Sequence, residues 1–150
     1  MADIEKLLDS VSDVIGAAAG NEKHKRTGAV IVAAGSSSRM NGVDKQFVEL
    51  NGMPVLAHTV RAFENAGCID EIVIVTKKEK ITAVIEMCEK YGFSKVTSVV
   101  PGGETRQISA WLGFSELPDK TRFAAIHDGA RCLVTPQMIE NVCRAAYIYG

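Results

Sequence analysis

Apolar residues along most of the chain form four short continuous runs that alternate with longer segments of helical spacing. The continuous runs cover 29–32, 72–75, 96–100 and 123–126, the third with polar interruptions. Short runs of this kind are typical of strands that are covered on both faces. We therefore predict four buried strands.

Four segments between and after these runs have the periodicity of amphipathic helices, and they cover 54–66, 81–91, 105–117 and 136–149. Pro54 suits a first helical turn, and Gly67 and Gly92 follow the ends of the first two segments. A strand and a helix repeated four times predict an α/β fold, a Rossmann-like doubly wound and mostly parallel sheet with right-handed crossovers. Ligands of such sheets bind beyond the carboxyl ends of the strands.

The N-terminal residues differ from this pattern, and we predict an extension over 1–26 and an α/β domain over 27–150. Within the extension, apolar residues recur at helical spacing, namely Ile4, Leu7, Leu8, Val11 and Ile15. This spacing predicts a short amphipathic helix, which is followed by a polar linker over 20–26. Three possibilities stay open for this helix: it docks on the domain, it docks on a partner, or it frays as a marginal helix. We favour docking.

Composition narrows the function classes. A length of 150 residues, 47% of them hydrophobic and 23% charged, suits one soluble domain with a real core. The net charge of −1 argues against a non-specific nucleic-acid binder. The four cysteines show neither a C-x-x-C pair nor metal-ligand spacing, so we expect reduced thiols and a cytoplasmic protein. No apolar run approaches the roughly 20 residues of a membrane helix, so no membrane segment is expected.

A loop rich in small residues, A-A-G-S-S-S-R-M over 33–40, begins where the first apolar run ends. Small residues let backbone N–H groups approach a triphosphate, and Arg39 and Lys45 supply positive charge nearby. The spacing fits neither a Walker loop nor a G-x-G-x-x-G fingerprint. We predict a phosphate loop of another type; the alternative is a serine-rich surface turn with a solvated arginine.

Two further motifs follow the third and fourth apolar runs. Gly102 and Gly103 would let a nucleobase lie against the backbone, unless they form only a plain turn. Arg106 and Ser109 lie on one face at the start of the next helix, where a nucleotide could meet both. Asp128 is the candidate for holding Mg²⁺ or orienting a ribose, since Mg²⁺ binds through few carboxylates plus substrate phosphates; a routine strand-end aspartate is the alternative. We interpret the neighbouring histidine as structural.

Three sequence segments together, A-A-G-S-S-S-R-M with K-Q-F over 45–47, G-G-E-T-R-Q-I-S over 102–109 and H-D-G-A-R over 127–131, resemble the cytidylyltransferases that act on 2-C-methyl-D-erythritol 4-phosphate. The resemblance covers about residues 28–150 and implies a nucleotidyltransferase-type fold. It also implies transfer of CMP from CTP to a sugar-alcohol phosphate, with release of pyrophosphate, in the non-mevalonate route to isoprenoids. Ribitol 5-phosphate cytidylyltransferases are similar, and enzymes that activate hexose phosphates with another nucleotide are wider rivals.

The resemblance also implies roles for single residues. Arg39 and Lys45 correspond to catalytic cations, Arg131 to an acceptor-binding residue or a subunit contact, and Asp128 to the Mg²⁺ ligand. The implied nucleotide-binding residues are Ala33, Ala34, Gly35, Ser36, Gly102, Gly103, Arg106, Ser109 and Asp128. The sequence departs from the family pattern at Glu104 and Thr105, where relatives often carry Asp and Glu, and at Cys132, where proline is usual.

In the implied reaction a phosphate oxygen of the acceptor attacks the α-phosphorus of CTP, and no nucleophilic side chain is needed. The chain stops at Gly150, whereas the similar enzymes continue into a second half with a dimer arm, more acceptor-binding residues and another catalytic lysine. The full-length family therefore implies a homodimer, and this chain looks truncated. A nucleotide-binding fragment without catalysis, and a doubly wound domain whose loops are only turns, stand as the alternatives from other classes.

Overall fold

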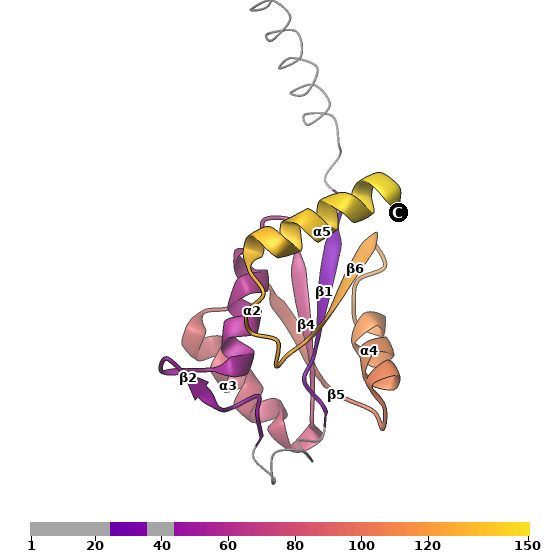
Figure 1. Ribbon diagram of the computed structural model, residues 1–150. Helices are drawn as coiled ribbons and strands as arrows, with labels where there is room; N and C mark the ends of the chain where they lie inside the picture. Colours follow the sequence, from indigo (N-terminus) through magenta and orange to yellow (C-terminus); the bar gives the residue numbers. More distant parts are fainter. Residues whose placement is uncertain (1–24, 36–43) are drawn as a thin grey trace, which may run out of the picture.

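A computed structural model describes residues 25–35 and 44–150 of the protein (Figure 1). The predicted N-terminal helix, most of the predicted linker, Ser36 and Arg39 lie outside these residues. The strands are β1 (Thr27–Val32), β2 (Glu49–Leu50), β3 (Met53–Pro54), β4 (Glu71–Thr76), β5 (Val96–Pro101) and β6 (Phe123–Asp128). The helices are α2 (Val55–Asn65), α3 (Ile81–Tyr91), α4 (Arg106–Ser115) and α5 (Pro136–Tyr149), with a short 3₁₀ turn, η2 (Lys78–Lys80), before α3.

Four strands form one parallel sheet in the order β5-β4-β1-β6, which confirms the predicted doubly wound α/β fold. The chain moves outward from β1 to β4 and β5 and then returns to β6 on the other side of β1. Figure 1 shows α4 apart from α2 and α3, on the opposite side of the sheet. The strand order therefore reverses between β1 and β6. In open α/β sheets such a switch point leaves a crevice beyond the carboxyl ends of the two strands.

The two inner strands and the two outer strands differ in burial. Every residue of β1 and β4 is buried, as the continuous apolar runs predict. For β5 and β6 the prediction of coverage on both faces is wrong, because these are the edge strands and exposed positions interrupt them. Ile126 of β6, for example, is 47% exposed. Helix α4 packs mainly over β1, β4 and β5, and Ile126 of β6 is only partly covered.

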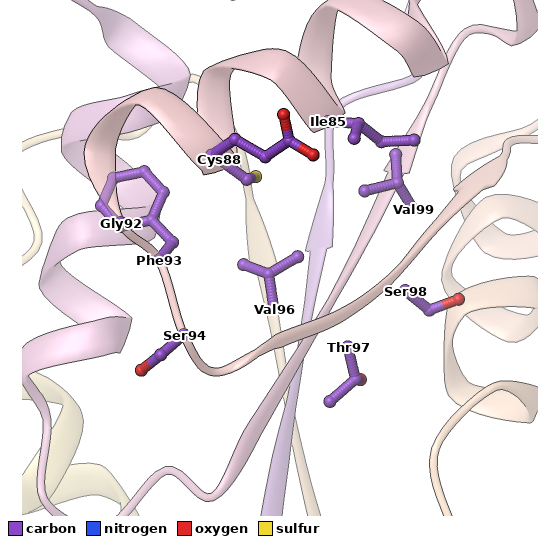
Figure 2. Close-up of a pocket in the computed structure, with 10 residues that line it drawn as sticks. Ile85, Cys88, Gly92, Phe93, Ser94, Val96, Thr97, Ser98 and Val99 are labelled. Atoms are coloured by element: carbon purple, nitrogen blue, oxygen red, sulfur yellow. The ribbon is translucent and has the colours of Figure 1, made fainter.

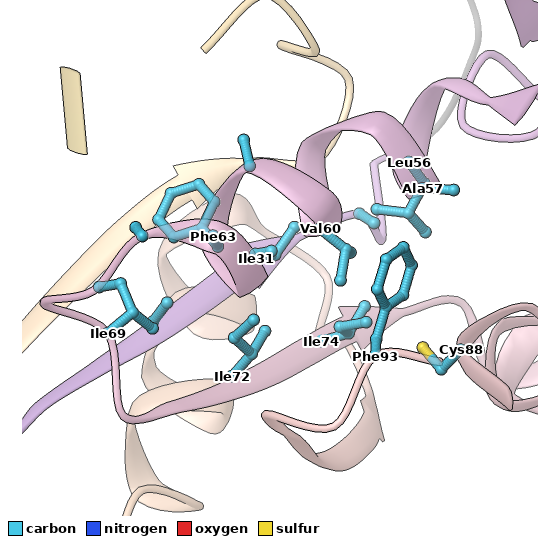
Figure 3. Close-up of a cluster of buried hydrophobic side chains, with 14 of the residues drawn as sticks. Ile31, Leu56, Ala57, Val60, Phe63, Ile69, Ile72, Ile74, Cys88 and Phe93 are labelled. Carbon is cyan, nitrogen blue, oxygen red and sulfur yellow. The ribbon is translucent and has the colours of Figure 1, made fainter. Parts of the chain in front are cut away.

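The core lies on both faces of the sheet. The larger cluster joins β1 and β4 to α2, α3 and α5, and Figure 3 shows Ile31, Leu56, Phe63 and Ile74 within it. The smaller cluster joins the opposite face to α4 and comprises Val30, Val32, Val73, Val75, Ala110 and Leu117. Burial of these apolar surfaces is the main force that holds the sheet and the helices together.

A β-hairpin that the sequence analysis does not predict joins β2 to β3. Its turn residues Asn51 and Gly52 have φ values of 52° and 75°. An Asn-Gly pair with both φ angles positive is the preferred sequence for a tight hairpin turn. The dipeptide is therefore the signal in the sequence that could have revealed this hairpin.

The last two residues of the predicted linker belong to the body of the protein. The ammonium group of Lys25 donates a hydrogen bond of 2.7 Å to the carbonyl oxygen of Tyr147. Arg26 forms an ion pair of 2.9 Å with Glu71, whose side chain is almost fully buried. Thr121 donates a further hydrogen bond to the same carboxylate. Lys25 and Arg26 are therefore part of the folded body, because the buried carboxylate requires a cation from this segment.

None of the helices in the described ranges is long and apolar enough to cross a membrane. The longest of them, α5, has 14 residues.

Candidate nucleotide site

The first part of the predicted phosphate loop lies at the carboxyl end of β1. Ala33 is buried and its N–H donates to the carbonyl oxygen of Val75 at 2.7 Å. Ala34 is half-buried and Gly35 is exposed. The loop therefore begins at the carboxyl end of β1, beside the switch point, as predicted. Ser36 and Arg39 follow directly but lie outside the described residues.

The second motif is in contact with this loop. The N–H of Gly102 donates to the carbonyl oxygen of Thr76 at 2.8 Å. A Cβ atom on Gly102 would lie 2.3 Å from the Cβ of Ala34 and 2.8 Å from the Oγ of Ser109. Such distances are far below van der Waals contact, so only glycine permits this approach. Residues 68 positions apart in the sequence therefore share one wall of the crevice.

Replacing Gly102 by alanine is expected to push Ala34 away and to lower the free energy of unfolding by about 1–3 kcal/mol, the usual cost of overpacking. Gly67→Ala is the matched control, because a Cβ there would meet Glu140 at an ordinary 3.6 Å. Urea unfolding measures both variants. Equal stability of the two variants would contradict the close packing of Gly102 against Ala34.

Ser109 is hydrogen-bonded to the backbone of the glycine pair, Gly102 and Gly103. Its side chain is buried, and its hydroxyl oxygen accepts a hydrogen bond of 3.1 Å from the N–H of Gly103. At the start of the same helix, the Thr105 side chain accepts from the N–H of Ile108 and so acts as the N-cap of α4. Ser109 therefore reaches the crevice through the backbone of Gly103, and a direct contact with nucleotide stays a prediction.

The third motif joins the other two through Asp128, at the carboxyl end of β6. Both the Nε and an Nη atom of Arg106 lie 2.8 Å from Oδ1 of Asp128. The Nε of Arg131 lies 2.9 Å from Oδ2. Each carboxylate oxygen thus faces one guanidinium group. The two arginines are exposed, so they can turn toward an anion in the crevice without leaving a buried charge behind.

Opposing effects set the pKa of Asp128. Burial alone would raise this pKa, but the hydrogen bond from Arg106 and the charges of Arg106 and Arg131 outweigh burial, so the pKa is lowered. The carboxylate is therefore charged at neutral pH. This leaves it available to a metal ion.

The lowered pKa predicts a pH dependence of stability. The contribution of Asp128 is present above its ordinary pKa of about 3.8 and is lost as the pH falls through the lower pKa of the folded state. We expect Asp128→Asn to unfold at lower urea concentration than the wild type at pH 7. This difference should shrink progressively below pH 4. If the two proteins differed in urea midpoint by the same amount at pH 7 and well below pH 4, the ion-pair interpretation would be wrong.

The neighbouring residue His127 packs its ring against Phe63, with 5.1 Å between ring centroids. Burial lowers the pKa of His127 and outweighs the effect of the adjacent Asp128, so the ring is neutral at pH 7. These contacts support the structural role that we expect for it.

Lys45 is exposed and lies in a segment that the start of α2 holds in place. The N–H of Leu56 donates to the carbonyl oxygen of Gln46 at 3.0 Å, and the N–H of Val55 donates to that of Val48 at 2.9 Å. The first N–H groups of a helix lack partners within the helix, and this segment supplies them. Within the described ranges Lys45 forms no ion pair, so its charge is free to meet an anion.

The described residues contain no group of three side chains that could hold a metal ion alone. Mg²⁺ does not require one, because it commonly binds to one or two carboxylates together with substrate phosphates. Asp128 fits that arrangement once one of its exposed arginines turns away. The residues present therefore suit an ion that arrives with a triphosphate.

A separate cavity of about 500 Å³ lies between α3 and β5 (Figure 2). Its lining includes Ile85, Cys88, Phe93 and Val99 and none of the predicted site residues. Burial is the main cause that raises the pKa of Cys88 to about 11. This thiol is therefore not a nucleophile at neutral pH. The cavity lies between α3 and β5, whereas the predicted site residues lie beyond the carboxyl ends of the strands.

Comparison with known proteins identifies the family of the chain. The family model of 2-C-methyl-D-erythritol 4-phosphate cytidylyltransferase matches residues 27–148. The protein of that name from Dehalococcoides mccartyi is 43% identical over 127 residues, which cover 85% of this chain and 56% of the relative. A Clostridium botulinum protein of the same name is 42% identical over 122 residues, with 81% and 53% covered.

A solved structure agrees with these sequence matches. The crystal structure of 4-diphosphocytidyl-2C-methyl-D-erythritol synthase from Anaerococcus prevotii has a TM-score of 0.72 and 27% identity, over 83% of this chain and 52% of that chain. The chain spans about half the length of the relatives it matches. The matched region contains the sheet and all three motifs. The chain belongs to the 2-C-methyl-D-erythritol 4-phosphate cytidylyltransferase family.

Proposed function

We propose that the protein transfers CMP from CTP to 2-C-methyl-D-erythritol 4-phosphate and releases pyrophosphate. The single observation that carries this proposal is the meeting of three distant motifs at the switch point of the sheet, where Gly102 contacts Ala34 and Arg106 pairs with Asp128. Family membership supplies the reaction type. This chemistry requires residues that bind the triphosphate, the base and the acceptor phosphate, and cations that stabilise the transition state.

The nucleotide occupies the crevice between β1 and β6. The N–H groups of Ala34 and Gly35, together with the Ser36 hydroxyl, bind the triphosphate, and Ala33 fixes the start of this loop through its bond to Val75. The cytosine lies against Gly102 and Gly103, whose lack of side chains leaves backbone groups accessible for base recognition. Ser109 holds that backbone, and Arg106 meets the ribose or a phosphate.

Positive charge stabilises the transition state. A phosphate oxygen of the acceptor forms a bond to the α-phosphorus, while the bond to the β-phosphate oxygen breaks and pyrophosphate leaves with the electron pair. We assign Arg39 and Lys45 to stabilising the charge that develops on the transferred and leaving groups. The acceptor phosphate is already ionised near neutral pH, so the reaction needs no general base.

Asp128 and the triphosphate would together hold Mg²⁺, which neutralises phosphate charge when bound. Arg131 is exposed beside Asp128 and is the residue that we assign to the acceptor phosphate. In this proposal the nucleotide and the acceptor lie on either side of the Asp128 carboxylate.

The partners that we propose are CTP and a sugar-alcohol phosphate, with neither nucleic acid nor membrane. The proposed α/β domain over 27–150, with Lys25 and Arg26 packed against it, carries the site, and the reduced cysteines fit the cytoplasm. A homodimer is the assembly that the family implies. Nucleotide binding without catalysis is the second candidate, because the chain spans about half of the relatives it matches.

A pyrophosphate-release assay tests the proposal. The full 150-residue chain is incubated with CTP and Mg²⁺, and with methylerythritol phosphate, ribitol 5-phosphate or no acceptor. We expect release that depends on methylerythritol phosphate. Faster pyrophosphate release with ribitol 5-phosphate would identify ribitol 5-phosphate as the acceptor in place of methylerythritol phosphate. CTP binding without release from either acceptor would favour the non-catalytic candidate.

A further inference from the structure

We propose that Thr59, in the middle of α2, is a positioning residue that fixes the Asp128 turn against the loop after β1. The proposal rests on the function above, because it concerns how that site is held. Thr59 is fully buried, and its hydroxyl donates a hydrogen bond of 2.7 Å to the carbonyl oxygen of Gly129, 70 residues away. Gly129 is the residue directly after Asp128.

The hydroxyl of Thr59 has no evident role in packing. Its neighbours along the buried face of α2 are Leu56, Ala57, Val60 and Phe63, all apolar. Valine has nearly the same shape, would pack equally well there and would avoid burying a polar group. The oxygen of Thr59 also lies 3.4 Å from the carbonyl oxygen of Val55, a long contact beside the short one to Gly129. The bond to Gly129 is therefore what distinguishes threonine from valine at this position.

Gly129 is held from three directions. Its N–H donates to the carbonyl oxygen of Val32 at 2.8 Å, and its own carbonyl oxygen accepts from Thr59. A Cβ on Gly129 would lie 3.0 Å from Ala33, from Oε1 of Gln46 and from Leu56. The peptide thus rests on the end of β1, on the Lys45 segment and on α2. A shift of this peptide would move the Asp128 side chain with it.

One helix consequently sets the positions of two separate site segments. The N-terminus of α2 fixes the main chain on both sides of Phe47, next to Lys45, as described above. Thr59, one turn further along the helix, fixes the turn that carries Asp128. The distance between a charge-bearing lysine and a metal-binding carboxylate decides how well both act on one triphosphate, and small displacements are costly in such sites. Thr59 therefore acts on the nucleotide through Asp128 and does not touch it.

The test compares Thr59→Val with Thr59→Ser in the full chain, and Thr82→Val is the control at an exposed helical position. Amide hydrogen exchange measures the rate at Gly129 relative to the rate at Ile31, in the centre of β1. We expect this ratio to rise about 5- to 10-fold in Thr59→Val, because losing the bond to the Gly129 carbonyl loosens this residue and weakens the bond from its N–H to Val32. Thr59→Ser should restore the ratio, and Thr82→Val should leave it unchanged.

A uniform acceleration at Gly129 and Ile31 would show a merely structural role and would overturn the proposal, as would an unchanged ratio. The second readout is the affinity for CTP with Mg²⁺, which we expect to fall several-fold in Thr59→Val and to recover in Thr59→Ser. Unchanged affinity, where the wild type binds CTP, would also contradict positioning. If the wild type binds no CTP, the proposed function fails, while the exchange ratio still decides the role of Thr59.

Discussion

Replacing Asp128 by asparagine is expected to lower kcat/KM for cytidylyl transfer by about 10²-fold or more. Asparagine keeps the shape of the side chain and an oxygen that can accept from Arg106, but it removes the negative charge between Arg106 and Arg131. The site then loses its candidate metal ligand and gains net positive charge. Pyrophosphate release at increasing Mg²⁺ concentration measures the effect.

The control for this variant is Asp119→Asn, the same change at an exposed position in the loop before β6. It should leave the rate within about twofold, because exposed substitutions away from a site have small effects. We also expect Asp128→Asn to require more Mg²⁺ for half-maximal rate. Wild-type activity and wild-type Mg²⁺ dependence in Asp128→Asn would show that Asp128 has no role in the reaction.

The largest expected effect on stability comes from Phe63→Ala, which should lower the free energy of unfolding by about 3–5 kcal/mol. Phe63 is buried in the larger core cluster (Figure 3) and its ring also packs against His127 of β6. Truncation leaves a cavity that the sheet and α2 cannot close. Because domains have only about 5–15 kcal/mol of stability, this single change removes a large fraction of it.

Phe114→Ala is the matched control, because this ring is 43% exposed on α4 and lies next to Trp111. Its loss should cost about 1 kcal/mol or less, since little apolar area returns to water. Urea unfolding followed by circular dichroism measures both variants. Similar losses for the two variants would mean that Phe63 does not hold the core as its burial indicates.

The fold could be predicted from the sequence where the signals are local. The continuous runs of β1 and β4 and the proline and glycine boundaries of the helices predict the right elements in the right order. The edge positions of β5 and β6 could not be predicted in this way, because an apolar run has the same composition at a sheet edge as at its centre. Strand order is a long-range property, and the return of the chain to β6 determines which strands stay open.

The candidate site could be predicted in outline, since the ends of parallel strands meet at one edge of a sheet. The pairings between residues within the site could not be predicted. The pairing of Asp128 with Arg106 joins residues of two loops, and the bond of Thr59 to Gly129 spans 70 positions. A threonine in an apolar stripe gives no sign of its distant partner. Only the packing of α2 against the turn after β6 shows it.

The measurement that tests the central claim most directly is calorimetric titration of the full chain with CTP, ATP, GTP and UTP in the presence of Mg²⁺. Arg39→Ala and Lys45→Ala serve as site variants, and Lys120→Ala, at an exposed position, serves as the control. We predict selective binding of CTP that weakens in both site variants and is unchanged in the control. A folded chain that binds no nucleotide, or that binds all four equally, would contradict the assignment of a cytidine nucleotide site to these motifs.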